Sequence, residues 1–235
     1  MIRVTDLAVS YGAVEALRGV SFEAETGSVT AVIGANGAGK TTLLRTISGL
    51  VRPKAGAVDL DGTHLVGMRP EDIARHGIGH VPEGRGVIEE FTIEENLRLG
   101  ALHGKQSLKA GLEDQFDLFP VLGERRRQPA GTLSGGERQM LAMARALIAK
   151  PIVLLLDEPS LGLAPIVTAD LMRTVRELCE SRNLTVILVE QDAMSALKVS
   201  ERAVVLHVGR VAAYDTSDVV AADDDLRRYY LGIAQ

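Results

Sequence analysis

The chain has 235 residues, enough to bury the core of one large domain or of two tightly coupled lobes, and its 46% hydrophobic and 24% charged residues are ordinary for a globular protein. The net charge of −5 argues against nucleic acid as the main partner, and the single cysteine, Cys179, excludes an internal disulfide framework and suits a reducing compartment. No apolar run reaches the roughly 18–20 residues that span a bilayer, and the N-terminus shows no signal-peptide pattern, so we expect a chain that acts at a membrane only through a partner.

The N-terminal part of the chain is predicted to consist mostly of strands, because apolar residues alternate or form short runs between glycine-rich turns. The expected strands span residues 2–9, 21–25, 29–33, 56–60 and 78–81, and the expected helices span residues 41–50 and 70–77. Asp61 and Gly62 follow the fourth of these strands and predict a hairpin turn.

From about residue 92 to residue 150 the pattern becomes helical, with helices expected over residues 93–102, 108–119 and 135–149 and with Pro120 and Pro129 between them. Strands are then expected over residues 152–156, 185–189, 203–208 and 210–214, and helices over residues 166–181 and 223–231. Strands separated by helices imply a parallel sheet with ligand sites at the carboxyl ends of the strands. We therefore predict one α/β domain over residues 1–235, with a core of residues 1–91 and 151–235 and an inserted helical subdomain of residues 92–150.

A phosphate-binding loop follows the strand at residues 29–33 and opens the next helix. Its pattern, Gly-x-x-x-x-Gly-Lys-Thr from Gly34 to Thr41, lets the backbone wrap around a phosphate with its N–H groups pointing inward, and the start of the helix favours anionic oxygens. Lys40 is expected to reach the β- and γ-phosphates of ATP, and Thr41 to offer its hydroxyl to Mg²⁺. The residues predicted to hold the nucleotide here are Gly34, Asn36, Gly37, Ala38, Gly39, Lys40, Thr41 and Thr42.

Two acids, Asp157 and Glu158, end the fully apolar strand at residues 152–156. Taken alone, these two acids indicate only a strand whose end is charged and exposed to solvent. In a parallel sheet, however, the end of this strand lies beside the phosphate loop, where Mg²⁺ needs oxygen partners. We predict that Asp157 serves the metal and that Glu158 orients or deprotonates the attacking water, so that Glu158 and Lys40 are catalytic residues.

A second glycine-bearing helix start lies at residues 133–137, Leu-Ser-Gly-Gly-Glu. Ser134 and Glu137 satisfy the capping-box pattern, which on its own is a complete structural explanation. Two successive glycines weaken a helix by about 1 kcal/mol each relative to alanine, but they remove side chains where something must approach the backbone. Because the chain already has a phosphate loop, we predict that Ser134, Gly135, Gly136 and Glu137 contact a nucleotide that a second molecule holds.

With these three motifs in order, the chain resembles the ATP-binding subunits of ABC transporters from about residue 2 to residue 233. The resemblance implies a P-loop NTPase (RecA-like) core with an N-terminal antiparallel β subdomain and an inserted α-helical subdomain. It also implies that two subunits enclose two ATPs, each between the phosphate loop of one subunit and the signature helix of the other, and that closure and reopening drive membrane subunits. Tyr11 stands where the family has an aromatic residue that stacks on adenine; a tyrosine that merely ends a strand is the structural alternative.

The chain departs from the family at three positions. Glu83 stands where most members have a glutamine that links Mg²⁺ to the membrane-subunit contact, so Glu83 is a candidate for nucleotide and metal binding. Gln191 stands where most members have a histidine near the γ-phosphate; an amide donates a hydrogen bond to phosphate but does not exchange a proton near neutral pH. Ala164 stands where most members have an aspartate. These departures leave Glu158 as the principal catalytic group, and Gln191 is predicted as a further catalytic residue beside it.

Short motifs narrow the resemblance further. Pro-Glu-Gly-Arg at residues 82–85, Leu-Gly-Leu-Ala-Pro at 161–165, Val-Glu-Gln at 189–191 and Tyr-Leu-Gly at 230–232 resemble the smaller ATPase subunit of branched-chain (hydrophobic) amino-acid importers. That resemblance implies a similar but non-identical second ATPase subunit, two permease subunits and, indirectly, an external solute-binding protein. It also implies a peripheral position at the cytoplasmic face of the membrane and no nucleic-acid partner.

Three other interpretations stay open at this point. Importers of urea or of short amides are related to this branch. A non-transport ABC-type ATPase that acts on DNA or ribosomes usually has tandem ATPase halves, long insertions or basic extensions, which this sequence does not show. A P-loop small-molecule kinase would leave residues 133–137 unexplained.

The resemblance also implies a membrane-subunit contact in the groove between the core and the helical insertion, near Gly84–Phe91. The apolar side chains of Val87, Ile88 and Phe91 either receive a short permease helix or pack against the insertion itself.

Overall fold

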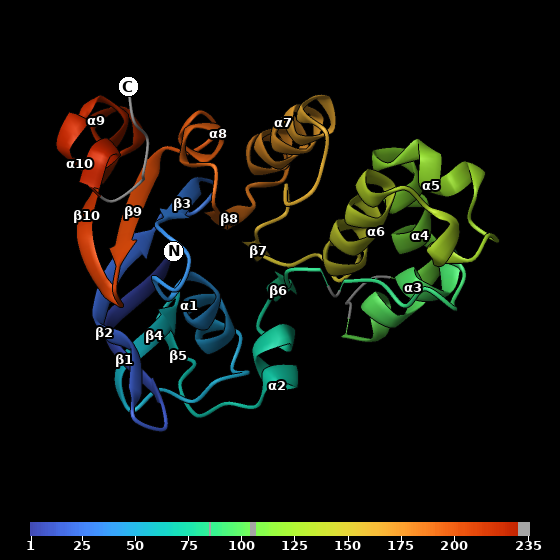
Figure 1. Cartoon of the computed structure of the whole chain (residues 1–235). Coiled ribbons are helices and arrows are strands. Elements are labelled where there is room, and N and C mark those ends of the chain that lie inside the picture. The colour runs from blue at the N-terminus through green and yellow to red at the C-terminus, as the bar shows by residue number, and fades with distance from the viewer. Residues whose placement is uncertain (85, 104–106, 230–235) are drawn as a thin grey trace.

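The computed structural model describes residues 1–84, 86–103 and 107–229, and a six-stranded sheet forms its centre (Figure 1). In spatial order the strands are β10 (Arg210–Thr216), β9 (Arg202–His207), β3 (Val29–Ile33), β8 (Thr185–Glu190), β7 (Val153–Asp157) and β6 (Ile78–Val81). All neighbours run parallel except β10 and β9. The register pairs Ile33 with Glu190 and Asp157 with Val189, so the carboxyl ends of β3, β8 and β7 meet at one edge. The phosphate loop after β3 is thereby brought beside the acids after β7.

The parallel strands are apolar on both faces because other elements cover both faces. In β7, Leu154 and Leu156 belong to a core shared with α7 (Pro165–Arg182), whereas Val153 and Leu155 belong to a core shared with α1 (Lys40–Ile47). Figure 1 shows α7 and α8 (Ala193–Leu197) on one side of the sheet and α1 on the other. The predicted α/β architecture is confirmed.

A separate antiparallel sheet shares the second of these cores. Its strands, in spatial order, are β2 (Val14–Ala24), β1 (Ile2–Tyr11), β4 (Ala55–Leu60) and β5 (Thr63–His64). β4 and β5 form the predicted hairpin, in which Asp61 and Gly62 have positive φ angles of 47° and 85°, as a type I′ turn requires. β2 begins well before the predicted start at residue 21, because after a tight turn it pairs with β1 from Val14 onward.

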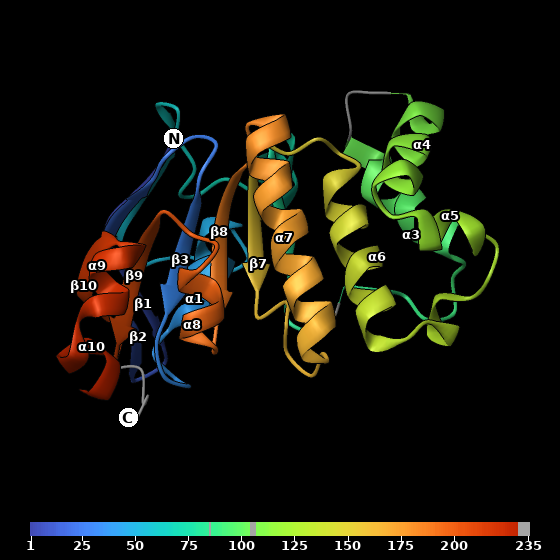
Figure 2. The same ribbon diagram turned by 90° about the horizontal axis from the view of Figure 1, so that it is seen from above.

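The helices that lie between β6 and β7 in the chain gather at one end of the molecule (Figures 1 and 2). They are α3 (Ile93–Gly100), α4 (Leu108–Leu118), α5 (Pro120–Glu124) and α6 (Gly135–Leu147), with short 3₁₀ turns at Ala101–His103 and Ala130–Thr132. The side chain of buried Asn96 accepts the N–H of Ile88 at 2.8 Å and donates to its carbonyl at 2.9 Å, which fixes the loop before α3 onto that helix. The exact division into a core and a helical subdomain of residues 92–150 stays a prediction.

The predicted helix at residues 223–231 corresponds to α10 (Asp224–Tyr229), and α9 (Ser217–Ala222), which was not predicted, precedes it. Asp223 separates them: its Oδ1 accepts the backbone N–H groups of Asp225 and Leu226, both at 3.0 Å, which starts a new helix. Residues 230 and 231 of the predicted helix, the Tyr-Leu-Gly motif and Arg85 lie outside the described residues. The remaining helix, α2 (Pro70–Arg75), precedes β6 as expected. Within the described ranges, no helix has the length and apolar character needed to cross a bilayer.

Candidate active site

A cavity of about 690 Å³ opens at the carboxyl edge of the parallel sheet. It brings together residues from six separate segments of the chain. The predicted site residues that line it are Tyr11, Asn36, Gly37, Ala38, Gly39, Lys40, Thr41, Thr42, Glu83, Glu158 and Gln191. Gly34 and Asp157 lie directly behind this lining, in contact with Lys40 and Thr41 respectively.

The phosphate loop reaches the cavity with bare backbone at the start of α1. Gly39 is the N-cap of this helix, has a φ of 109° and makes no side-chain capping hydrogen bond. A Cβ atom on Gly39 would lie 2.7 Å from the carbonyl oxygen of Ala16, and one on Gly34 would lie 2.2 Å from that of Leu206. Both glycines are therefore required by close backbone approaches, and the free N–H groups at the helix start are available to an anion.

Lys40 is the buried cation of the cavity, with a side chain that is only 5% exposed. Its Nζ donates to the carbonyl oxygen of Gly34 at 2.8 Å and lies 3.4 Å from Oε1 of Glu158. The loop thus holds its own lysine at the floor of the cavity, facing Glu158 directly after β7. The structure places Lys40 and Glu158 close together, as predicted.

Asp157 lies deeper, and Thr41 connects it to the phosphate loop. The Thr41 hydroxyl donates to Oδ1 of Asp157 at 3.2 Å, and Asp157 is 2% exposed. Burial raises the pKa of the Asp157 carboxyl above its usual value; the Thr41 hydrogen bond acts in the opposite direction, and the nearby carboxylates of Glu158 and Glu83 raise the pKa further. A cation placed among these oxygens would relieve the crowding of negative charge.

This oxygen set fits Mg²⁺. Mg²⁺ typically takes one or two protein carboxylates together with substrate phosphates and water, so a cage of protein ligands is not needed. Among residues 1–84, 86–103 and 107–229 no group of three or more His, Cys, Asp or Glu side chains is arranged to hold a metal by itself. Thr41 and Asp157 are in contact, and exposed Glu83 lines the same cavity, which matches a site where substrate phosphates supply further ligands.

The backbone of Glu158 is unusual, because its φ of 48° puts a non-glycine residue in the left-handed region. Its N–H donates to the carbonyl oxygen of Val189 at 2.9 Å, which ties the turn after β7 to the end of β8. Sequence reasoning missed the residue that follows Val189. Glu190 is 2% exposed, and its Oε1 accepts the N–H of Ser160 at 3.0 Å. The available signal was an acid at the last position of an otherwise apolar strand.

The signature segment lies outside this cavity. Ser134 caps α6 through the predicted capping box: Ser134 Oγ accepts the N–H of Glu137 at 3.3 Å, and Glu137 Oε2 accepts the N–H of Ser134 at 2.8 Å. None of Ser134, Gly135, Gly136 and Glu137 lines the cavity, and Ser134 and Gly135 are exposed. This chain's own signature helix therefore does not close its own phosphate site.

The two glycines of the signature differ in what surrounds them. A Cβ on Gly136 would lie 2.6 Å from Cγ1 of Val167 on α7, so packing within the chain already requires a glycine there. A Cβ on Gly135 would meet only Leu163, at an ordinary 3.6 Å. Packing within the chain therefore explains the glycine at position 136. Only Gly135 still requires another explanation, such as the approach of a group from outside the chain.

Two weaker predictions concern surface side chains. Tyr11 lines the cavity and is 48% exposed, so an aromatic face is accessible there. Of the apolar residues expected at the membrane contact, Val87 packs against the main core, Ile88 is half-buried and Phe91 is 40% exposed. A cavity of about 300 Å³ lies close by, between β6, α3 and α6, and Gly86, Leu99, Ala142 and Arg145 are among its lining residues.

Comparison with known proteins decides the family. A family model described as "ABC transporter" matches residues 17–161. The chain belongs to the ABC transporter family. It is 44% identical to the high-affinity branched-chain amino acid transport ATP-binding protein BraG of Pseudomonas aeruginosa, across 99% of this chain and 100% of that protein. It is 37% identical to the probable branched-chain amino acid transport ATP-binding protein LivF of Archaeoglobus fulgidus, across 99% of each chain.

Solved structures of the family agree along nearly the whole chain. A nucleotide-free ATP-binding cassette from an ABC transporter matches 100% of this chain and 99% of its own, with a TM-score of 0.88 and 25% identity. An ATP-binding cassette of an ABC transporter in its ADP conformation matches 97% of each chain, with a TM-score of 0.86 and 26% identity. The P-loop NTPase fold and the nature of the chain as a nucleotide-binding ATPase cassette are thereby confirmed. The roles of individual residues stay predictions.

Proposed function

We propose that this chain is the ATP-hydrolysing subunit of an importer for branched-chain or other hydrophobic amino acids, at the cytoplasmic face of the membrane. The observation that carries the proposal is the 44% identity with BraG, which extends over the full length of both proteins. The cavity at the edge of the parallel sheet supports the chemistry, since it combines an anion-binding helix start, a buried lysine and an acid.

ATP enters this cavity with its phosphates at the start of α1. The backbone N–H groups from Asn36 to Thr42 surround the phosphates, and Lys40 neutralises the β and γ oxygens. Tyr11 offers its exposed ring to adenine. Thr41, Asp157 and Glu83 would hold Mg²⁺, which would neutralise the negative charge that develops on the phosphate oxygens.

Hydrolysis needs a water molecule aligned with the γ-phosphate. Glu158 lies at the floor of the cavity opposite Lys40 and accepts a hydrogen bond, and then a proton, from that water. Gln191, exposed at the cavity wall, donates its amide N–H to a γ-phosphate oxygen. Since an amide does not take up a proton near neutral pH, Glu158 is the group that accepts the proton from water.

A second subunit completes the site. Ser134 and Gly135 face solvent and lie outside the cavity, so their exposed backbone is free to contact an ATP held by another subunit. We propose a similar, non-identical ATPase subunit as that partner. Two permease subunits and, indirectly, an external solute-binding protein complete the importer. We propose the cavity lined by Gly86, Leu99 and Arg145 as the binding site for a short permease helix.

Reconstitution tests the proposal. The chain is purified by affinity from native membranes with its associated subunits, and the assembly is placed in lipid vesicles with ATP on the side of the ATPase. We expect ATP-dependent uptake of leucine, isoleucine or valine when the solute-binding protein is present. Uptake of urea or short amides alone would assign another solute. The absence of permeases from the purified assembly, together with ATPase activity stimulated by nucleic acid, would overturn the transport function.

A further inference from the structure

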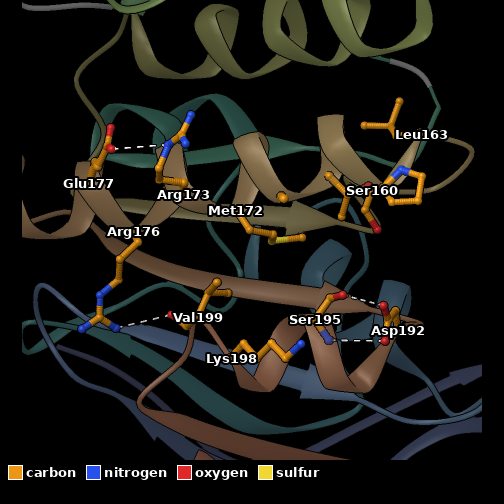
Figure 3. Close-up of a pocket in the computed structure, with 13 residues that line it drawn as sticks. Ser160, Leu163, Met172, Arg173, Arg176, Glu177, Asp192, Ser195, Lys198 and Val199 are labelled. Atoms are coloured by element: carbon orange, nitrogen blue, oxygen red, sulfur yellow. Dashed lines mark hydrogen bonds and ion pairs between the residues drawn. The ribbon is translucent and has the colours of Figure 1, made fainter.

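Two chain segments form a wall between the candidate active site and a second cavity. The second cavity has a volume of about 660 Å³ and lies between α7 and α8 (Figure 3). In the turn after β7, Glu158 lines the active-site cavity and Ser160 lines the second one. After β8, Gln191 lines the active-site cavity and Asp192 lines the second one. Figure 3 shows Ser160 and Asp192 at the same end of this second cavity.

Glu190 is buried between these two segments and connects them through its side chain. It is 2% exposed, and its Oε1 accepts the N–H of Ser160 at 3.0 Å. Burial raises the pKa of this carboxyl, and the hydrogen bond from Ser160 acts in the opposite direction. A buried carboxylate is costly, and hydrogen bonds to a charged acceptor are stronger than neutral ones. Glu190 therefore ties the turn after β7 to the end of β8, directly before Gln191.

The turn held in this way contains the strained residue of the site. Glu158 has a φ of 48°, a conformation that a non-glycine residue keeps only where its surroundings enforce it. The carbonyl oxygen of Val189 accepts the Glu158 N–H at 2.9 Å, and Glu190 accepts the N–H of Ser160. Two consecutive residues of β8 thus fix the turn, one through its backbone and the other through its side chain.

We propose that Glu190 is a positioning residue that holds the turn carrying Glu158 and the segment carrying Gln191 in one arrangement. The two groups that face the γ-phosphate position then keep a fixed relation to each other. Glu190 does not line the active-site cavity; it acts through its hydrogen bond to Ser160 and through its place directly before Gln191 in the chain. The inference rests on the proposed ATP hydrolysis at this site.

A matched pair of variants tests the proposal in the chain assembled with its partner ATPase. Glu190→Ala removes the acceptor of the Ser160 N–H. The control, Thr185→Val, removes an equivalent acceptor from the same strand: Thr185 is 2% exposed, and its Oγ1 accepts the N–H of Gly27 at 3.2 Å, at the other end of β8. We expect kcat to fall about tenfold to hundredfold in Glu190→Ala, with the Kd for ATP and the kcat of the control each within about twofold of wild type.

Glu190→Gln measures the contribution of the acceptor oxygen separately from that of the charge. Its amide oxygen still accepts the Ser160 N–H. Its NH₂ group, however, is a donor and cannot accept a hydrogen bond as the second carboxylate oxygen can. We expect this variant to recover part of the lost kcat. Because it keeps the size of the side chain, it carries the same measurements if Glu190→Ala does not fold.

Hydrogen exchange of the Ser160 amide gives a readout that does not depend on turnover. We expect protection of this amide to fall about tenfold or more in Glu190→Ala, to be partly restored in Glu190→Gln and to stay unchanged in Thr185→Val. Unchanged Ser160 protection in Glu190→Ala would overturn the proposal, as would a loss of kcat no larger than that of Thr185→Val at equal loss of Tm. A wild-type pair that binds ATP without hydrolysing it would refute the proposed function, and the amide measurement would still decide whether Glu190 holds the turn.

Discussion

Replacing Glu158 by glutamine is expected to separate ATP binding from ATP turnover. The Glu158 side chain is 12% exposed, and its Oε1 lies 3.4 Å from Lys40 Nζ. Glutamine keeps the size and the hydrogen-bonding oxygen but takes no proton from water. A positioned general base contributes about 10²–10⁴-fold to a rate, which corresponds to about 3–5 kcal/mol of transition-state stabilisation. We expect kcat to fall by this factor.

The affinity for ATP is expected to stay the same or to rise in Glu158→Gln. At 3.4 Å the attraction between Lys40 and Glu158 is about 5 kcal/mol for an effective dielectric constant of 20. A triphosphate competes with this attraction for the same ammonium group. Removing the carboxylate charge removes the competition, while the desolvated ammonium loses a partner, so we expect the affinity for ATP to rise by roughly tenfold at most.

Phosphate release at saturating ATP and calorimetric ATP binding measure the two effects in the assembled pair. Glu15→Gln is the matched control, because Glu15 lines the same cavity but is 64% exposed and lies 3.6 Å from Arg18 rather than beside Lys40. The control is expected to keep turnover and affinity within about twofold of wild type. Hydrolysis at the wild-type rate in Glu158→Gln would refute the role of Glu158.

Three further predictions concern the metal, the packing and the pH dependence. Asp157→Asn is expected to weaken Mg²⁺ binding to the ATP-loaded protein by about tenfold or more; a Mg²⁺ titration measures this, and an unchanged titration would remove Asp157 from the metal site. Gly136→Ala is expected to lower the Tm, because the new Cβ would lie 2.6 Å from Cγ1 of Val167, whereas Gly135→Ala leaves the Tm unchanged or raises it. Adding Val167→Ala to Gly136→Ala should restore the Tm, and failure to do so would contradict the packing argument. Burial, with a smaller contribution from Arg45, lowers the pKa of His80 to about 4 from 6.5, so the free energy of unfolding is expected to fall as the pH drops from 6.5 to 4, by at most about 3 kcal/mol. Urea unfolding at both pH values measures this loss, and an equal loss in His80→Gln would contradict the assignment.

The parts of the fold that follow from local pattern were predictable. β3 spans the expected residues 29–33, because an apolar run followed by a glycine-rich loop has few alternative structures. α5 was not expected, because Pro120 was interpreted as a break between helices, whereas it occupies the first turn of a helix, where its missing N–H costs nothing. The early start of β2 depends on its pairing with β1, which no local pattern encodes.

The candidate site divides in the same way. The phosphate loop and the acids after β7 were predictable, since parallel strands bring their carboxyl ends to one edge. Glu190 was not, because its importance lies in a hydrogen bond to Ser160, thirty positions away in the chain. The requirement for glycine at position 136 likewise comes from Val167 on another helix. Contacts between distant segments decide these roles, and the sequence alone does not show them.

The claim that a neighbouring subunit completes the catalytic site is tested most directly by dilution. The rate of ATP hydrolysis per ATPase chain is measured as the assembled pair is diluted through its dissociation range, with the fraction of paired chains determined in parallel. We predict that the rate falls in proportion to the paired fraction, while ATP binding persists in isolated chains, because Ser134 and Gly135 lie outside the cavity that contains Lys40. An undiminished rate per chain in strictly monomeric protein would contradict the account.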